Sequence, residues 1–269
     1  MIHRRDISKA ATRDRVPEKS VEKDYAIHWV MAGLARTGLH ARLAFKGGTA
    51  LRLCRFEGYR YSEDIDLTAV DTVDTAAAFT AFREVSSWVR QESAIQLEAV
   101  ETSAETHEDG FSFKVEYTGP LGGDAGSRSI KVDLSTSEKV LFPIEGLPLK
   151  PHYADLPAEA RIRCYSLGEV VVEKFRSLLN PARREPRDVY DLWHLAEKSP
   201  VRAEELGGAF RGKSAFKNLD PEALLATMAK KEKALASLWK SRLSHQVADL
   251  PPFEGAFRIV QREAKKLLS

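Results

Sequence analysis

The chain has 269 residues, of which 43% are hydrophobic and 30% charged, and its formal net charge is +2. This is the composition of an ordinary globular protein, and the length allows a large core in one large domain or two smaller ones. No apolar run reaches the length of a membrane span and the N-terminus lacks a signal-peptide core, so we expect a cytoplasmic protein without membrane contacts. Cys54 and Cys164 lie among apolar residues without metal-type spacing, which indicates buried free thiols.

The charges are divided unevenly along the chain. Residues 1–149 hold 19 Lys and Arg against 23 Asp and Glu, whereas residues 150–269 hold 22 against 16. A basic half beside an acidic half suits a polyanionic partner such as RNA, although solvated helix faces explain the charge equally well. The proline-rich stretch 143–165 reads as a linker or an extended crossing segment, and we place a domain boundary there, at residue 150.

The first predicted element is a helix from Val21 to about Thr37. Ser20 is its expected N-cap, and Gly38 ends it in the usual position. We assign the charged residues 22–24 near its start to positioning and surface charge.

A glycine turn follows the first predicted strand, which covers residues 42–45. Gly47 and Gly48 permit a tight turn because neither carries a Cβ, and Thr49 is expected to cap a helix over residues 50–56. Such a turn leaves backbone N–H groups unpaired at the positive end of a helix dipole. The stretch therefore predicts a phosphate site.

A second strand is predicted over residues 59–67. Alternate residues of a strand share a face, so Ser62, Asp64 and Asp66 are expected to point the same way. Two carboxylates on one face favour a hard cation such as Mg²⁺ between them. Alone, the aspartates fit a solvated strand end and the glycines an ordinary turn; together, in this order, they indicate metal-assisted handling of a nucleoside triphosphate.

A helix is predicted next over residues 75–92, and then three strands over 95–100, 111–117 and 128–135 that extend the sheet in antiparallel fashion. In the third of these strands, apolar residues alternate with polar ones. Asp133 lies on the polar face, either as a functional carboxylate or as the partner of Lys131.

The second half is predicted to be helical. Ser166-x-x-Glu169 reads as a capping box for a helix ending at residue 179, and Lys174 on its apolar face either extends to solvent or enters a cleft. Pro186 starts the next helix, where Asp188 suits the helix dipole or an arginine partner and Asp191 has no capping role. Further helices are predicted over 221–228, 233–244 and 257–268.

Four stretches carry a resemblance to a known family. They read V-E-K-D-Y, F-K-G-G-T-A-L, Y-R-Y-S-E-D-I-D-L and R-D-V-Y-D-L. In this order, over about residues 21–195, they resemble the AbiEii-type nucleotidyltransferase toxins of type IV toxin–antitoxin and phage-defence systems. The resemblance implies an α+β fold, in which a mixed or antiparallel nucleotidyltransferase-like sheet flanked by helices forms a catalytic domain over residues 1–150. Residues 151–269 would form a mainly helical, basic domain that contributes to nucleotide and acceptor binding.

The resemblance also implies roles for single residues. Asp64, Asp66 and Asp133 would form a two-metal site for Mg²⁺, with Mn²⁺ as the alternative ion. Lys174 would contact the nucleotide, and we favour Asp191 over Asp188 as the functional late aspartate. The other candidates for nucleotide binding lie in the turn and the second strand, namely Lys46, Gly47, Gly48, Thr49 and Ser62.

The implied activity is transfer of a nucleoside monophosphate from an NTP to RNA, at the 3′ end of tRNA, with release of pyrophosphate and a block of translation and growth. A cognate antitoxin encoded nearby is the implied partner, and a phosphate on Ser62 would put a dianion beside the metals and block them. One alternative is a nucleotidyltransferase that acts on a small-molecule or protein hydroxyl. Another is a catalytically silent nucleotide-binding module.

Overall fold

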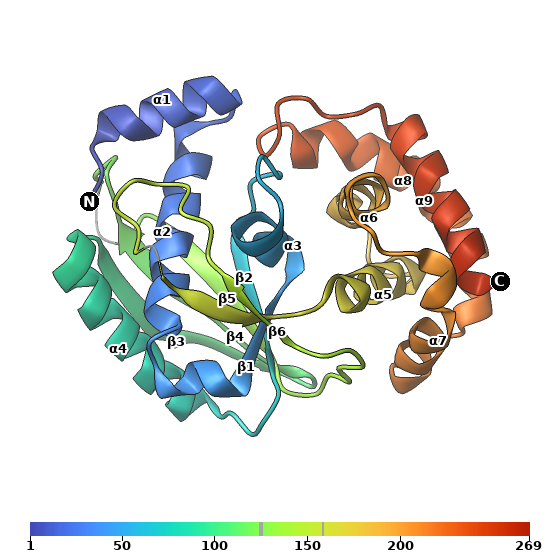
Figure 1. Cartoon of the computed structure of the whole chain (residues 1–269), viewed down its shortest axis with the longest axis horizontal. Helices are drawn as coiled ribbons and strands as arrows, with labels where there is room; N and C mark the ends of the chain where they lie inside the picture. The colour runs from blue at the N-terminus through green and yellow to red at the C-terminus, as the bar shows by residue number, and fades with distance from the viewer. Residues whose placement is uncertain (124–125, 158) are drawn as a thin grey trace. The chain divides into compact units, whose positions relative to one another are not determined.

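The computed structural model describes all residues except 124, 125 and 158, and it divides the chain into two compact units (Figure 1). The first comprises residues 1–138 and 144–164, and the second comprises residues 139–143 and 165–269. Along the chain, the last change from the first unit to the second falls between Cys164 and Tyr165, whereas the sequence led us to expect a boundary at residue 150. In the described part of the chain, no helix combines the length and the apolar character that crossing a membrane requires.

The first unit is built on a seven-stranded mixed sheet with the strand order β3-β4-β5-β2-β1-β7-β6. Its strands are β1 (Leu43–Lys46), β2 (Asp64–Ala69), β3 (Gln96–His107), β4 (Gly110–Thr118), β5 (Ser129–Ser135), β6 (Glu145–Pro148) and β7 (Arg161–Cys164). β2 pairs parallel with β5 and β1 parallel with β7, while the other neighbours are antiparallel. The predicted α+β architecture and the antiparallel order of β3, β4 and β5 are confirmed.

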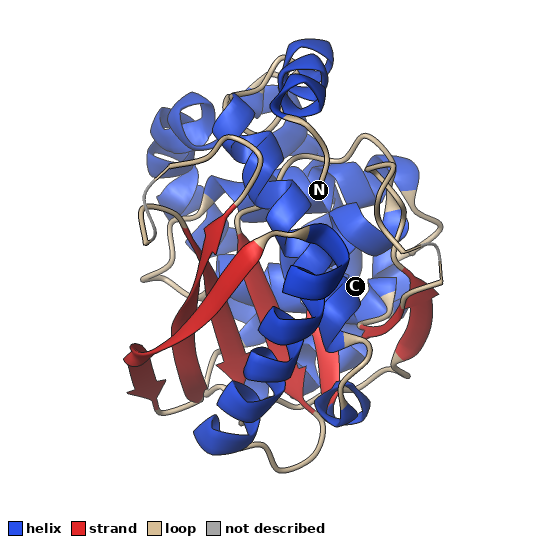
Figure 2. Cartoon of the chain, turned by 90° about the vertical axis from the view of Figure 1, so that its left-hand side faces the viewer, coloured by secondary structure: helices blue, strands red, loops and turns tan. Residues whose placement is uncertain are grey.

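Helices cover one face of this sheet (Figure 2). They are α2 (Glu18–Leu34) and α4 (Thr75–Ser93), with α1 (Arg4–Asp14) packed on α2, and the short α3 (Gly47–Ala50) continues into a π-helical turn at Leu51–Arg55. The core joins buried side chains of α2 and α4, such as Val30 and Phe82, to the apolar face of the strands, such as Ile65. Because this face is filled with apolar groups, the alternate residues of the same strands form a polar face.

Three local predictions in this unit are wrong. α2 begins at Glu18 after Pro17, so Ser20 lies inside the helix instead of capping it. The stretch 143–165 is no simple linker, since β6 and β7 within it join the edge of the sheet beside β1. β2 begins only at Asp64, later than expected, which leaves Ser62 outside the strand. Cys54 and Cys164 are buried free thiols, as predicted.

The second unit is helical. Its helices are α5 (Leu167–Leu179), α6 (Pro186–Lys198), α7 (Gly207–Phe216), α8 (Leu224–Leu243) and α9 (Phe253–Leu268), with 3₁₀ turns at Ala203–Glu205 and Pro221–Ala223. Ser166 caps α5 by accepting from the Glu169 N–H, and Pro186 begins α6, as predicted. The Glu169 carboxylate, however, pairs with the buried Lys213 of α7 and accepts the N–H groups of Leu141 and Phe142, so it does not complete a capping box.

Candidate active site

A row of polar residues crosses the sheet on its polar face. Lys46 at the end of β1 lies opposite Asp66 of β2, and Asp66 lies beside Asp133 of β5. Asp64, two residues earlier on β2, points to the same side and lies beside Lys131. The structure thus places Asp64, Asp66 and Asp133 on adjacent strands, as the resemblance implies.

The glycine turn is shaped by the side chains that pack against it. Gly47 has a φ of 76°, and a Cβ at this position would collide with the Asp66 carboxylate. A Cβ on Gly48 would collide with the guanidinium of the buried Arg60. Both glycines are therefore needed for the close approach of a carboxylate and a guanidinium, in addition to the turn itself.

Thr49 does not cap the helix as predicted, because α3 starts at Gly47 and Lys46 occupies the N-cap position. Its hydroxyl instead donates a hydrogen bond of 2.5 Å to the backbone oxygen of Asp64. The helix after the glycine turn thereby holds the start of the strand that carries Asp64 and Asp66. Ser62 is buried and lies two residues before that strand.

The Lys131 ammonium contacts one of these carboxylates. Its Nζ lies 2.7 Å from Asp133 Oδ1, and its side chain is 49% exposed. Burial opposes its charge, but the hydrogen bond to Asp133 and the charges of Asp64 and Asp66 raise its pKa above the usual value. All three carboxylates thus favour the charged form of Lys131, and Asp133 contacts it directly. Lys46 adds a second cation on this face, with its Nζ 3.3 Å from Ser135 Oγ.

Carboxylate oxygens are the ligand type that a hard divalent cation prefers, but among the described residues the three aspartates are not a group whose ligand atoms all lie within 4.8 Å of one another. The site offers carboxylate oxygens from two adjacent strands, and the Gly47 turn leaves the space that Asp66 occupies. The half-exposed Lys131 can partly neutralise the carboxylates when no metal is bound. The two interpretations of Asp133 are thus compatible, since a residue that pairs with Lys131 can also serve as a metal ligand.

Buried polar residues of the V-E-K-D-Y stretch connect α2 to the segment that leads into the strand of Asp64 and Asp66. Asp24 accepts from Arg52 Nε at 2.5 Å, Arg52 Nη1 donates to the Tyr59 carbonyl at 2.5 Å, and the guanidinium lies 3.6 Å from the centre of the Tyr61 ring. Arg52 thus connects α2 to the segment that leads into β2. Asp24 and Glu22 are buried, so the assignment of this stretch to surface charge is wrong for both.

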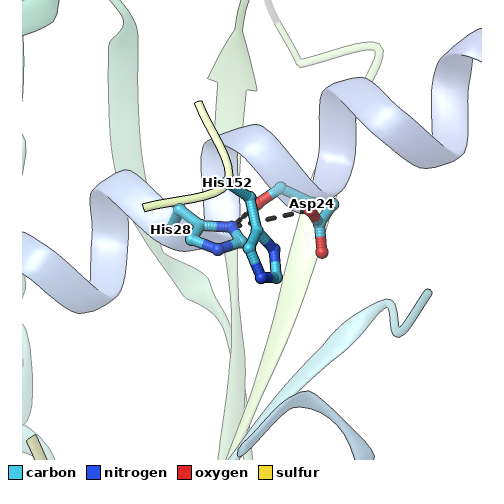
Figure 3. Close-up of side chains that lie close together, drawn as sticks. All are labelled: Asp24, His28 and His152. Atoms are coloured by element: carbon cyan, nitrogen blue, oxygen red, sulfur yellow. Dashed lines mark hydrogen bonds and ion pairs between the residues drawn. The ribbon is translucent and has the colours of Figure 1, made fainter. Parts of the chain in front are cut away.

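Asp24 also belongs to the one Asp/His group of the described residues whose possible ligand atoms all lie within 4.8 Å of one another (Figure 3). His28 Nδ1 lies 2.8 Å from the Asp24 carbonyl, and the rings of His28 and His152 are 4.8 Å apart. Arg52 donates to both carboxylate oxygens of Asp24, so a metal ion would add a second positive charge in a buried place. We interpret this group as structural.

A second charged cluster lies in the helical unit. Lys174 Nζ lies 2.8 Å from Asp188 Oδ1 and 2.7 Å from Asp191 Oδ2, and Arg183 Nε lies 2.7 Å from Asp188 Oδ2. Both aspartates are buried. Burial works against the charge of Asp188, but Lys174 and Arg183 hold its pKa below the usual value. Asp188 pairs with these residues and with neither arginine favoured by its position, Arg184 or Arg187.

Comparison with known proteins gives the following result. The model of a family described as "Nucleotidyl transferase AbiEii toxin, Type IV TA system" matches residues 29–259. Among solved structures, MenT4, a nucleotidyltransferase toxin from Mycobacterium tuberculosis H37Rv, is similar with a TM-score of 0.70 at 18% identity, over 99% of this chain and 90% of that chain. JHP933 from Helicobacter pylori is similar with a TM-score of 0.57 at 15% identity, over 94% and 93%. A search of curated protein sequences finds no match.

Proposed function

Because this chain belongs to the AbiEii family of nucleotidyltransferase toxins of type IV toxin–antitoxin systems, we propose that it transfers a nucleoside monophosphate from an NTP to an RNA hydroxyl. The proposed acceptor is the 3′ end of tRNA, and the modification would block translation and growth. The family implies an NTP substrate and an antitoxin partner. The observation that carries the proposal is the row of carboxylates beside the glycine turn, on strands held in register.

In this reaction the acceptor oxygen forms a bond to the α-phosphorus, and the bond from that phosphorus to the bridging oxygen of the β-phosphate breaks. Pyrophosphate leaves with both bond electrons, and the acceptor hydroxyl gives up its proton. Asp64 and Asp66 would hold the Mg²⁺ ion that orients the triphosphate, and with Asp133 they would hold a second ion that lowers the pKa of the acceptor hydroxyl. Positioning and charge stabilisation supply most of the rate in such transfers.

The surrounding residues fit supporting roles. The Gly47 turn and Lys46 lie beside Asp66, and we propose that they contact the triphosphate. Lys174 is proposed as a further triphosphate ligand. Its contacts with Asp188 and Asp191 fix its ammonium group, so both aspartates are positioning residues in this proposal and the preference for Asp191 loses its basis.

The test is to incubate the purified protein with total bacterial RNA, Mg²⁺ and each α-labelled nucleotide in turn. We expect label in a tRNA-sized band with at least one nucleotide. Asp64→Ala should abolish the labelling, while Asp71→Ala, which removes an exposed carboxylate just after the same strand, should retain it. Wild-type activity in Asp64→Ala would contradict the metal site. Failure to label RNA with any nucleotide would favour a small-molecule or protein acceptor.

Ser62 is a candidate site for control of the enzyme's activity by phosphorylation. It is buried two residues before β2, so a phosphate there would add negative charge next to the carboxylates and would need local opening of the segment to be attached. We propose that its phosphorylation blocks the enzyme. Mass spectrometry of protein inhibited by co-expression with its antitoxin tests this, and an unmodified Ser62 in fully inhibited protein would refute it.

A further inference from the structure

The helical unit contains a basic pocket that the proposed catalytic residues do not account for. It lies between the link from α5 to α6 and one side of α8, and its volume is about 400 Å³. Its lining residues include four cations and no acid: Pro181, Arg184, Thr227, Lys230, Lys231, Lys233 and Ala234. We name it the α8 basic pocket.

The spacing of residues on α8 explains why the cations gather here. Thr227, Lys231 and Ala234 lie at i, i+4 and i+7 and thus share a face of the helix, which Lys230 and Lys233 flank. Glu232, the acid within the K-K-E-K stretch, does not line the pocket. The helix therefore turns its positive charges toward the cavity and its nearest negative charge elsewhere.

These cations differ from their neighbours in their pairing. Within the described residues, Arg184, Lys230 and Lys233 have no ion-pair partner, and all three are exposed. The adjacent Arg183, in contrast, pairs with Asp188, and Arg211 of α7 pairs with Glu222. The link between α5 and α6 thus supplies one arginine to the Lys174 cluster and the next to the pocket.

Lys231 forms the inner wall of the pocket. It is only 4% exposed, and its Nζ donates to the carbonyl oxygens of Leu178 at 2.6 Å and Asn180 at 2.8 Å. These bonds use two of the three N–H groups of the ammonium. Burial, together with the charges of Arg183 and Arg184, lowers the pKa of Lys231 to about 8, against the opposing effect of Asp188. An anion in the pocket would stabilise the charged form.

We propose that the α8 basic pocket binds a phosphate group of the RNA backbone. The proposal rests on the proposed RNA acceptor and extends it by naming a binding surface. Cations on long side chains are the usual contacts of backbone phosphates, which fix the position of a nucleic acid without reading its sequence. Among the described residues that line the pocket, none is aromatic, so a base has no ring to stack on. This favours a backbone phosphate over a free nucleotide.

The test compares two double variants of α8. Lys230→Ala with Lys233→Ala removes two pocket cations, and Lys240→Ala with Arg242→Ala removes two exposed cations from the last turn of the same helix. Lys231 is left intact because its amino group bonds the end of α5. Binding of fluorescein-labelled bacterial tRNA is followed by fluorescence anisotropy over a range of salt concentrations, in the Asp64→Ala background, so that no transfer reaction contributes.

We expect the pocket variant to bind tRNA more weakly. The plot of its log K against log salt concentration should also fall less steeply, with the magnitude of the slope reduced by about 2, one for each lysine. The Lys240/Arg242 control should keep the parent slope. Equal slopes for the two variants would refute RNA binding at the pocket, while the proposal of an RNA acceptor would stand. Absence of salt-dependent tRNA binding by the parent protein would overturn both.

A second arm separates the two sources of phosphate. Binding of each of the four NTPs with Mg²⁺ to the same variants is measured by calorimetry. We expect equal NTP affinities for the pocket variant and its control. A loss of NTP affinity confined to the pocket variant, with an unchanged tRNA slope, would assign the pocket to the nucleotide and overturn the RNA proposal.

Discussion

The two units each hold a cluster of aspartates, and the clusters differ in how their charge is balanced. In the sheet unit, Asp64, Asp66 and Asp133 lie partly exposed on neighbouring strands, and Asp133 contacts the half-exposed Lys131. In the helical unit, Asp188 and Asp191 are buried and contact the largely buried Lys174 directly. The same residue type thus appears in an open site and in a closed one.

The difference indicates two uses of a carboxylate. Charges on an open strand face repel one another and can accept an exchangeable cation from solution. Charges buried with their own lysine are already neutralised, and they fix that lysine in one orientation at the cost of its removal from water. We therefore expect changes in the sheet cluster to affect activity, and changes in the helical cluster to affect stability as well.

The largest expected effect is the loss of activity in Asp66→Asn. This change keeps the shape that packs against Gly47 but removes the charge, so the nucleotidyl transfer rate should fall about 1,000-fold, equivalent to about 4 kcal/mol. The melting temperature without metal should not fall, because repulsion among the carboxylates decreases. A rate assay and a thermal melt on the same preparation check both parts, with Asp71→Asn as control. A large loss of stability would contradict the open-site interpretation.

Asp188→Asn, in the buried cluster, should in contrast lower the stability of the protein. It leaves Lys174 with Asp191 as its one charged carboxylate contact of the two and removes the charge from the carboxyl group that Arg183 contacts, so the free energy of unfolding should fall by about 3 kcal/mol. Denaturant unfolding measures this. Glu197→Gln, which changes an exposed carboxylate of the same helix, should stay within about 0.5 kcal/mol of wild type. If Asp188→Asn were inactive but fully stable, its role would be in the reaction and not in holding Lys174.

The open cluster was predictable from sequence because its features are local. The Gly47–Gly48 turn follows an apolar strand directly, and alternation alone places Asp64, Asp66 and Asp133 on polar faces. The residues at which α3 and β2 begin were harder to predict from the sequence. The two elements are joined there by the hydrogen bond from Thr49 to the Asp64 backbone, a contact between residues 15 positions apart that no local pattern encodes.

The closed cluster and the burial of charge were harder to predict. Asp188 looked like a helix-start residue, and only the packing of α5 on α6 brings Lys174 to it. The parallel pairing of β7 with β1 is a long-range contact that no local pattern encodes. α7 was missed because Gly207, Gly208 and Gly212 lower its helix propensity, whereas buried Phe210 and the Lys213–Glu169 pair stabilise it in the fold.

The pH dependence of stability should also differ between the units. Burial lowers the pKa of His28 and that of His152, the latter to about 4 from 6.5. In the unfolded chain both histidines bind protons below pH 6.5, so the sheet unit should lose stability as the pH falls from about 6.5 to 4. The lowered pKa of Asp188 stabilises the helical unit above about pH 4, and that contribution is lost only at lower pH.

His152→Gln tests this difference. Because the imidazole is partly accessible, we expect its contribution to be on the order of 1–2 kcal/mol. Thermal melts between pH 7 and pH 4.5 should show a smaller decrease in melting temperature for the variant than for wild type. Hydrogen exchange should locate the early loss of protection at α2 and residues 150–153. A variant with the same pH profile as wild type would refute the contribution of this histidine.

The smallest expected effect tests how rigidly the open cluster is held. Thr49→Val removes the hydroxyl that bonds the Asp64 backbone and leaves that carbonyl without its donor, so the free energy of unfolding should fall by about 1 kcal/mol. Thr49→Ser keeps the donor and should retain most of the stability. If Asp64 depends on this bond for its position, Thr49→Val should need a higher Mg²⁺ concentration for half-maximal activity, and Thr49→Ser should not. Equal Mg²⁺ dependence in the two variants would mean that pairing with β1 and β5 alone positions the carboxylates.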